Sequence, residues 1–198
     1  LKKIFRSNIF NGVIHFAALK SVSESVKNPE LYLSNNVEAT KNLIDIISSK
    51  EKKTNLIFSS SCTVYGQAEK LPINESSPVV NQDSPYGESK KICEEIIRNE
   101  IITNKNINGI SLRYFNPIGA HESSLIGELA KGIPENLVPY ITQSAIGKRK
   151  ELIIFGNDYP TRDGTCIRDY IHIKDLVKAH VSAFEFLSKM KKENFYDF

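Results

Sequence analysis

Short apolar runs alternate with longer amphipathic segments along most of the chain. The runs GVIHFAA (12–18), NLIFSSS (55–61) and ISLRYFN (110–116) are typical of buried strands. From Pro29 to about residue 50, and again from 84 to 104, apolar positions recur every three or four residues, which is the spacing of an amphipathic helix. This strand–helix–strand alternation predicts an α/β fold, with a parallel sheet covered by helices on both faces.

The pattern becomes less regular after residue 117. The stretch GAHESSLIGELAKG (119–132) is typical of a loop, and so is the segment 62–83 with its prolines, asparagines and serines. The change in composition near 117 predicts a smaller second lobe, connected to the first through later crossovers. For the rest of the chain we expect a helix begun by Pro134 over 134–147, a strand at 152–155, a strand at 168–173, a helix over 174–192 and a last strand that starts in FYDF.

The composition limits the classes of function. The chain has 198 residues, of which 40% are hydrophobic and 25% charged, as in a globular protein with one large or two small cores. A net charge of +3 with scattered basic residues argues against nucleic-acid binding, and no apolar run is long enough to span a membrane. The three cysteines fit a reducing compartment, and neither they nor the four histidines have the spacing of a metal site.

One tyrosine–lysine pair lies on the inward face of a predicted helix. Tyr86 and Lys90 are one turn apart in the segment 84–104, on the stripe that should face the core. Lysine is rarely buried, because taking an ammonium group out of water is costly. The chain contains a second such pair, Tyr170 and Lys174, but there the apolar residues alternate as in a strand. We therefore expect both side chains to point the same way off a strand rather than to pair on a helix.

This pair suits proton transfer to or from an alcohol. Free tyrosine has a pKa of about 10, and lowering it to near 7 requires roughly 4 kcal/mol. A cation within about 4–6 Å favours the phenolate, so Lys90 could supply part of that energy and a bound nicotinium ring could supply more. Ser59, Ser60 and Ser61 follow a predicted strand, at the end of the sheet where α/β proteins place ligands. A hydroxyl from this group could orient both Tyr86 and a substrate.

Other interpretations of these residues remain open. Tyr86 and Lys90 could be a core tyrosine and a lysine that extends its ammonium group to solvent, and Ser89 and Glu100 also fall near the inward stripe. The serines could suggest a nucleophile, but no GxSxG elbow is present. The ten glycines contain no GxGxxG or GxxGxxG pattern, so in a dinucleotide enzyme the phosphate-binding turn would lie before residue 1.

Several longer motifs resemble a single family. The motifs VIHFAALKSVSESVKNPELYLSNNV, FSSSCTVYG, SPYGESK, LRYFNPIGAH, GIPENLVPYI and FGNDYPTRDGTCIRDYIHIKDL closely resemble the UDP-glucose 4-epimerase family of extended short-chain dehydrogenase/reductases. The resemblance runs from about residue 11 to the end, in order and with few gaps, and implies a doubly wound parallel Rossmann-type sheet that lacks its N-terminal strands. It also implies that residues 1–116 are the remainder of an NAD-binding domain and that residues 117–198 are mainly a UDP-sugar lobe interwoven with the sheet.

The resemblance also implies roles for individual residues. Tyr86 would be the catalytic base, Lys90 would tune it and hold the nicotinamide ribose, and Ser61 would hydrogen-bond the reacting hydroxyl. The cofactor-binding residues would also include Phe16, Ala17, Ala18 (in place of a glycine), Leu19, Lys20, Asn35 and Phe115. The substrate-binding residues would be Asn116 at the nucleotide sugar, Asn136, Leu137 and Arg168 at the diphosphate, and Ile153 and Phe155 on either side of uracil.

The implied reaction is an internal oxidation and reduction at C4 that interconverts UDP-glucose and UDP-galactose. Tyr86 would take the hydroxyl proton as hydride passes to tightly held NAD⁺, and hydride would return to the other face of the 4-keto sugar. After the serine, related dehydratases carry an acidic pair and UDP-sugar decarboxylases carry a glutamate. Here Cys62 and Thr63 occupy those positions and cannot take that role, which favours epimerisation.

The chain also departs from the family in its extent. The glycine turn and the C-terminal substrate residues are missing, so we expect a fragment of a longer cytoplasmic enzyme. By analogy it would form a homodimer through the helices over 29–50 and 84–104, with no metal, nucleic-acid or membrane partner. The alternatives are an epimerase for another UDP-sugar, such as a UDP-pentose or a UDP-N-acetylhexosamine, and a non-catalytic remnant. The intact Ser61, Tyr86 and Lys90 argue against the remnant.

Overall fold

The computed structural model describes residues 1–104, 106–128, 132–190 and 194–198, and the chain divides into two compact units. Unit 1 contains residues 1–114 and 178–198, and unit 2 contains residues 115–177. In chain order, unit 1 contains α1 (Lys2–Ser7), β1 (Gly12–His15), α2 (Val22–Lys27), α3 (Pro29–Tyr32), the π-helical segment η1 (Leu33–Glu38), α4 (Ala39–Ser48), β2 (Thr54–Ser59), the 3₁₀ turn η2 (Cys62–Tyr65), α5 (Pro85–Thr103), β3 (Ile107–Leu112), most of α7 (Ile173–Lys189) and β6 (Phe195–Asp197).

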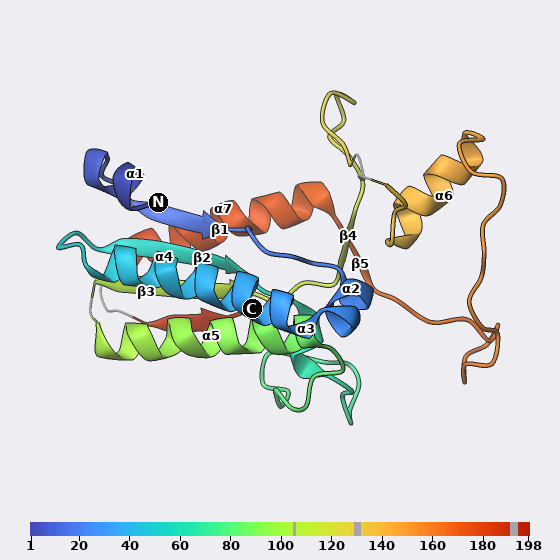
Figure 1. Ribbon diagram of the computed structural model, residues 1–198, viewed down its shortest axis with the longest axis horizontal. Helices are drawn as coiled ribbons and strands as arrows, with labels where there is room; N and C mark the ends of the chain where they lie inside the picture. Colours follow the sequence, from blue (N-terminus) through green and yellow to red (C-terminus); the bar gives the residue numbers. More distant parts are fainter. Residues whose placement is uncertain (105, 129–131, 191–193) are drawn as a thin grey trace. The chain divides into compact units, whose positions relative to one another are not determined.

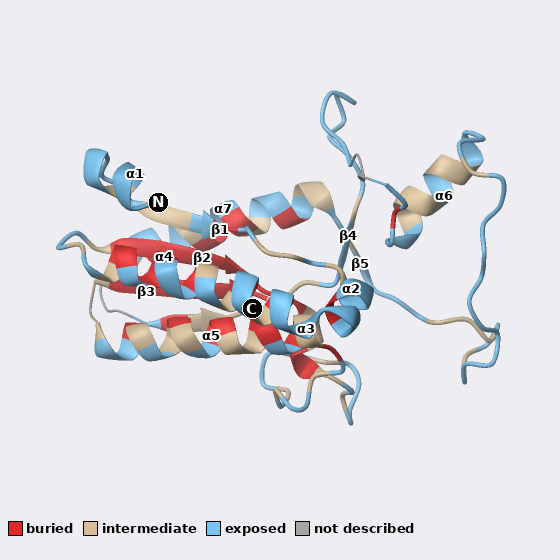
Figure 2. Cartoon of the chain, in the orientation of Figure 1, coloured by how far each residue is buried: buried red, intermediate tan, exposed pale blue. Residues whose placement is uncertain are grey.

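The core of unit 1 is a four-stranded sheet in the order β1-β2-β3-β6, and all neighbours are parallel (Figure 1). Ile57 of β2 pairs with Ile14 of β1 and with Ile110 of β3. Every residue of β2 and β3 is buried, as expected for strands covered on both faces (Figure 2). The predicted α/β fold with a parallel Rossmann-type sheet is therefore confirmed.

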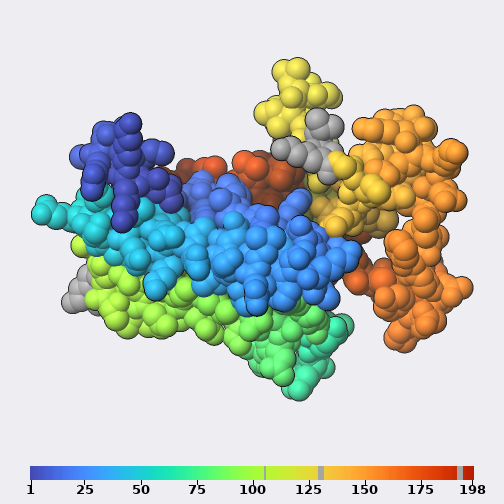
Figure 3. Space-filling model, viewed as in Figure 1, coloured from blue at the N-terminus to red at the C-terminus, as the bar shows by residue number. Residues whose placement is uncertain are grey.

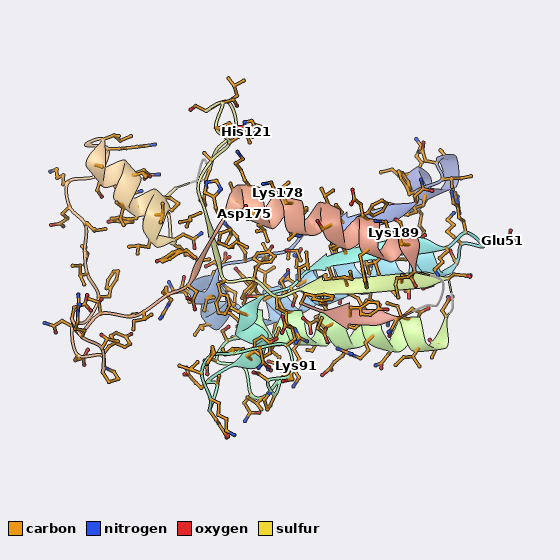
Figure 4. All side chains as sticks on the ribbon, turned by 180° about the vertical axis from the view of Figure 1, so that it is seen from behind. Glu51, Lys91, His121, Asp175, Lys178 and Lys189 are labelled. Carbon is orange, nitrogen blue, oxygen red and sulfur yellow. The ribbon has the colours of Figure 1, made fainter. Side chains whose placement is uncertain are left out.

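Helices cover both faces of this sheet. On one face, Ile44 of α4, Leu56 of β2 and Ile97 of α5 belong to one buried apolar cluster. On the other face, Ile57 of β2 packs in a second cluster with Leu187 of α7, which lies in front of the sheet in Figure 4. Successive side chains of β2 therefore point to opposite faces of the sheet, as in any β-strand. The surface over η1 and α4 (blue to cyan) borders the surface over α5 (green) in Figure 3.

The two helical segments predicted from the N-terminal half begin at prolines. Pro29 begins α3, which continues through η1 into α4, so the predicted single helix is interrupted by a π-helical segment. Pro85 is the first residue of α5, where its missing N–H costs nothing. Ser84 precedes it as the N-cap, and its side chain accepts a hydrogen bond of 3.2 Å from the Gly87 amide.

Unit 2 contains a short parallel strand pair, β4 (Asn116–Ile118) with β5 (Tyr170–His172), and the helix α6 (Leu137–Ala145). Irregular backbone connects α6 to β5. One turn in this connection requires glycine, because Gly164 has φ of +75° and a Cβ there would lie 2.1 Å from the Asn157 carbonyl oxygen.

One predicted strand is wrong. Residues 152–155 form no strand, because no described strand pairs with this apolar run and its side chains remain exposed. The strand predicted over 110–116 is present as β3, but it spans Ile107–Leu112, and residue 116 begins β4. Smaller differences are that the strand predicted over 12–18 ends at His15, the helix predicted from Pro134 begins at Leu137, and the predicted helix 174–192 spans Ile173–Lys189, with residues 191 and 192 outside the described part of the chain.

Candidate functional site

Three consecutive serines end the central strand of unit 1, and each has a different partner. The Ser59 hydroxyl forms a hydrogen bond with the hydroxyl of Tyr114. The Ser60 hydroxyl donates to a carboxylate oxygen of Glu94 at 2.5 Å. Ser61 begins the next element, the 3₁₀ turn η2. Its hydroxyl accepts hydrogen bonds from the amide and the hydroxyl of Thr63 in that turn.

The helix α5 brings Lys90 to this strand end. The Lys90 side chain is only 3% exposed, which confirms its predicted inward position. Its ammonium group donates a 2.7 Å hydrogen bond to the Ser59 carbonyl and lies 4.9 Å from the centre of the Phe58 ring and 5.9 Å from that of Tyr86. Lys90 is thus fixed by backbone and aromatic faces rather than by a direct bond to the phenol.

Burial dominates the electrostatics of the pair. It lowers the pKa of Lys90 from 10.5 to about 8, although Cys93 and Glu94 act in the opposite direction. It raises the pKa of Tyr86 to about 12, and the hydrogen-bonding influence of Ser61 only partly opposes this rise. Burial therefore outweighs the other influences on Tyr86 in this structure, and the role of the Lys90 charge in favouring the phenolate stays a prediction.

A buried asparagine that the sequence analysis missed connects the site. Asn36 in η1 is 2% exposed. Its side-chain oxygen accepts from the Leu19 amide at 2.8 Å, and its nitrogen donates to the Leu19 carbonyl at 3.0 Å and to the Ser89 hydroxyl at 3.1 Å. The loop after β1 is therefore tied to the helix that carries Tyr86. The predicted residue Asn35 is exposed and donates to the Asn36 side-chain oxygen at 3.1 Å.

The residues predicted to line a cofactor lie mostly in this loop. Phe16 is 56% exposed, and its ring lies 4.7 Å from that of His180. Ala17 and Lys20 are exposed, whereas Ala18 and Leu19 are half-buried. These residues follow β1 at the same end of the sheet as the serines that follow β2. The last predicted cofactor residue, Phe115, belongs to unit 2.

A second group of predicted residues lines one cavity of about 510 Å³ within unit 2. Its wall combines the N-terminal end of α6, the start of β4 and the irregular segments around 152–155 and 165–168. The apolar run that forms no strand therefore supplies cavity wall. Six of the eight residues predicted to contact the substrate line it, namely Asn116, Asn136, Leu137, Ile153, Phe155 and Arg168, whereas Ser61 and Tyr86 belong to unit 1.

The second tyrosine–lysine pair does not form a comparable site. Tyr170 lies in β5, but Lys174 lies in α7, so the prediction that both point off one strand is wrong. The Lys174 ammonium group pairs with Glu122 at 2.9 Å. Within the described ranges, no group of three or more histidine, cysteine and acidic side chains could hold a metal ion, and no helix is long and apolar enough to cross a membrane.

The chain matches a known family over almost its entire length. The sequence pattern of the NAD dependent epimerase/dehydratase family covers residues 1–197. UDP-glucose 4-epimerase of Bos taurus is 49% identical over 193 residues, which are 98% of this chain and 54% of the relative. The same enzyme of Yersinia pestis is 49% identical over 187 residues, or 94% of this chain and 55% of the relative. The chain therefore spans about half the length of the curated relatives it matches.

A solved structure gives the same result for the fold. The crystal structure of UDP-glucose 4-epimerase from Bifidobacterium longum in complex with NAD⁺ and UDP superimposes with a TM-score of 0.92 at 44% identity, covering 100% of this chain and 58% of that chain. The resemblance predicted from the motifs is confirmed by these matches.

Proposed function

The chain belongs to the NAD dependent epimerase/dehydratase family, and on that premise we propose that it carries the catalytic part of an enzyme that interconverts UDP-glucose and UDP-galactose. The observation that carries the proposal is the buried Lys90 next to Tyr86 at the strand end that contains Ser61, in a chain 49% identical to bovine UDP-glucose 4-epimerase. Parallel α/β sheets bind their ligands at this end.

Tyr86 is the group that exchanges a proton with the C4 hydroxyl of the sugar. Its pKa of about 12 keeps the phenol protonated at neutral pH, ready to donate to the 4-keto oxygen when the sugar is reduced. The opposite step requires the phenolate, which the Ser61 hydroxyl and a nearby positive charge both favour. Ser61 orients the reacting oxygen, and the Lys90 ammonium group contributes positive charge from a position fixed by the Ser59 carbonyl.

The exposed residues after β1 fit a bound NAD. Phe16 and Ala17 offer apolar surface at the carboxyl end of β1, and Asn36 holds the backbone of Leu19 through two hydrogen bonds. NAD would supply the acceptor and donor of the C4 hydride. The residues of this chain would bind and orient it, with the Lys90 ammonium group available to ribose hydroxyls.

The cavity in unit 2 supports recognition of the UDP group. Arg168 is exposed on its wall and can pair with a diphosphate through its forked N–H donors. Ile153 and Phe155 offer exposed apolar side chains that suit the two faces of a uracil ring. The assignment of unit 1 to NAD and of unit 2 to the UDP-sugar belongs to this proposal.

The test is turnover of UDP-galactose by a chimera in which this chain replaces the matching segment of the bovine relative. Anion-exchange chromatography would follow the formation of UDP-glucose. We expect Tyr86→Phe to lower the rate by about a thousandfold, the size of a lost general acid–base group. The matched control is Tyr196→Phe in β6, which β3 separates from β2 in the sheet, and this variant should retain the rate.

The same experiment separates the alternatives. A folded chimera that retains NAD but does not interconvert the two sugars would indicate an epimerase for another UDP-sugar. A folded chimera without NAD would indicate a non-catalytic remnant. Equal losses of turnover in Tyr86→Phe and Tyr196→Phe would contradict a catalytic role for Tyr86.

The proposal includes assembly and location. We infer a homodimer formed through α3–α4 and α5, whose surfaces expose Leu31 and Ile102, and sedimentation of the chimera would measure its mass. We also infer a cytoplasmic enzyme of galactose metabolism, because three cysteines without CxxC spacing fit a reducing compartment. Fluorescence microscopy of the tagged protein would test the location.

A further inference from the structure

Glu94 and Arg113 form a buried ion pair next to the serine strand end. Both side chains are 4% exposed, and the Arg113 guanidinium lies 2.5 Å from one Glu94 oxygen and 3.0 Å from the other. A buried pair of this kind contributes little net stability, because removing both charges from water can cost as much as their attraction returns. Its contacts with neighbouring residues therefore matter more than its own strength.

These contacts connect the elements that carry the catalytic residues. Glu94 lies on α5, one turn after Lys90, and accepts the hydrogen bond from the Ser60 hydroxyl. Arg113, just after β3, donates at 3.1 Å to the hydroxyl of Tyr65, the last residue of η2. The pair thus holds the chain on both sides of Ser61, one residue before it and four residues after it.

We propose that Glu94 and Arg113 are positioning residues that fix Ser61 relative to Tyr86 and Lys90. The inference rests on the proposed epimerase function. Neither residue is placed at the reacting atoms, and both act through the Ser60 hydroxyl and η2. The Lys90–Ser59 hydrogen bond also attaches the carboxyl end of β2 to α5, and the ion pair supplies a further attachment at the next residue.

The Ser60 hydroxyl is the best place to test this connection. Ser60→Ala removes the hydrogen bond without leaving an unpaired charge, whereas Ser60→Thr keeps a hydroxyl. A displacement of about 1 Å at a catalytic group can cost up to about a hundredfold in rate, and only one attachment of the strand end is lost here, so we expect about a tenfold lower kcat. The KM for UDP-galactose should stay unchanged, because the proposed UDP contacts lie in unit 2.

The pH profile provides a readout that a purely structural role would not move. Ser61 lowers the pKa of Tyr86 in this structure. Its displacement in Ser60→Ala should therefore shift the midpoint of the kcat profile to higher pH, and Ser60→Thr should restore the original midpoint. The matched control is Ser111→Ala on the neighbouring strand, since the Ser111 hydroxyl is fully buried and has no hydrogen-bond partner within the described residues.

A second variant keeps the test independent of folding losses. Glu94→Gln should also lower kcat, and adding Ser60→Ala to it should cause little further loss, because both changes act through the same hydrogen bond. An active chimera whose Ser60→Ala variant keeps the wild-type kcat and pH midpoint would overturn the positioning role. An inactive wild-type chimera would instead count against the proposed function itself.

Discussion

Replacing Lys90 by methionine should make the protein more stable and nearly inactive. Methionine has a similar length but carries no charge. Lys90 is 3% exposed and its ammonium group is held by one carbonyl oxygen, so the substitution changes little in the shape of the core. The expected gain in stability follows from the energy of the buried charge.

The expected gain in stability of Lys90→Met is the difference between two opposing contributions. Burial lowers the pKa of Lys90 from 10.5 to about 8, which corresponds to about 3 kcal/mol of stability withheld at neutral pH. The hydrogen bond to Ser59, made by a charged donor, returns about 1.5–3 kcal/mol and is lost in the variant. The difference leaves a gain of about 1 kcal/mol, or a Tm higher by about 3 °C for a chain of this size.

The sign of the pH dependence gives a sharper test. The unfolded state binds the Lys90 proton up to a pH of about 10.5, whereas the folded state releases it near pH 8. The wild-type stability should therefore rise with pH between about 8 and 10, and the rise should be absent in Lys90→Met. Above pH 10, the raised pKa of Tyr86 acts in the opposite direction, because the folded state then keeps a proton that the unfolded state loses.

Chemical denaturation of the NAD-free chimera at pH 7 and pH 9.5 would measure both effects. Turnover should fall by about a hundredfold, because Tyr86 loses the neighbouring charge that favours its phenolate. Lys91→Met is the matched control, since Lys91 is the next residue of α5, points away from the core and is not part of the site (Figure 4). A Lys90→Met variant destabilised by 1 kcal/mol or more, or one that keeps the wild-type pH dependence, would refute the reasoning.

Three further substitutions, one of them with a matched control, test the packing around the site. Burial and the Lys90 charge lower the pKa of His15 to about 4, so stability present above pH 6.5 should be lost on acidification, by about 2 kcal/mol at pH 5, and His15→Gln should remove this loss in denaturation curves. Gly66→Ala should cost about 2 kcal/mol or more, because Gly66 has φ of +57° and a Cβ would lie 2.1 Å from the Asn81 carbonyl oxygen, whereas Gly147→Ala, where nothing lies within 4 Å, should cost about 1 kcal/mol. Asn36→Ala should cost about 3 kcal/mol and reduce NAD retention during gel filtration, because three hydrogen bonds to the Leu19 backbone and Ser89 are lost.

The sheet could be predicted because its strands are buried on both faces. The apolar runs of β2 and β3 therefore stand out from the helices between them, and parallel topology follows from the alternation. The pattern of apolar residues was insufficient where a segment becomes a strand only if another strand pairs with it. The run LIIF at 152–155 has the composition of a strand, but nothing in a four-residue run shows whether another strand lies beside it.

The site could be predicted only in part for a similar reason. Helical spacing placed Lys90 inward, but it could not show that the ammonium group binds a carbonyl. The buried role of Asn36 could not be read from the sequence, because the π-helical segment η1 changes which side chains face inward; the predicted cofactor contact of Asn35 stays a prediction. The pairing of Glu94 with Arg113 depends on two elements that are far apart in sequence, and no spacing rule connects them.

The position of β6 at the end of the sheet has a consequence for synthesis. β3 and β6 are neighbours in the sheet, but all of unit 2 lies between them in the chain. During translation β1, β2 and β3 are made first, and the β3 edge that β6 will cover stays open while the ribosome produces the intervening residues. An open strand edge can pair with another chain, so the speed at which the ribosome completes α7 and β6 sets how long the nascent protein is exposed to aggregation.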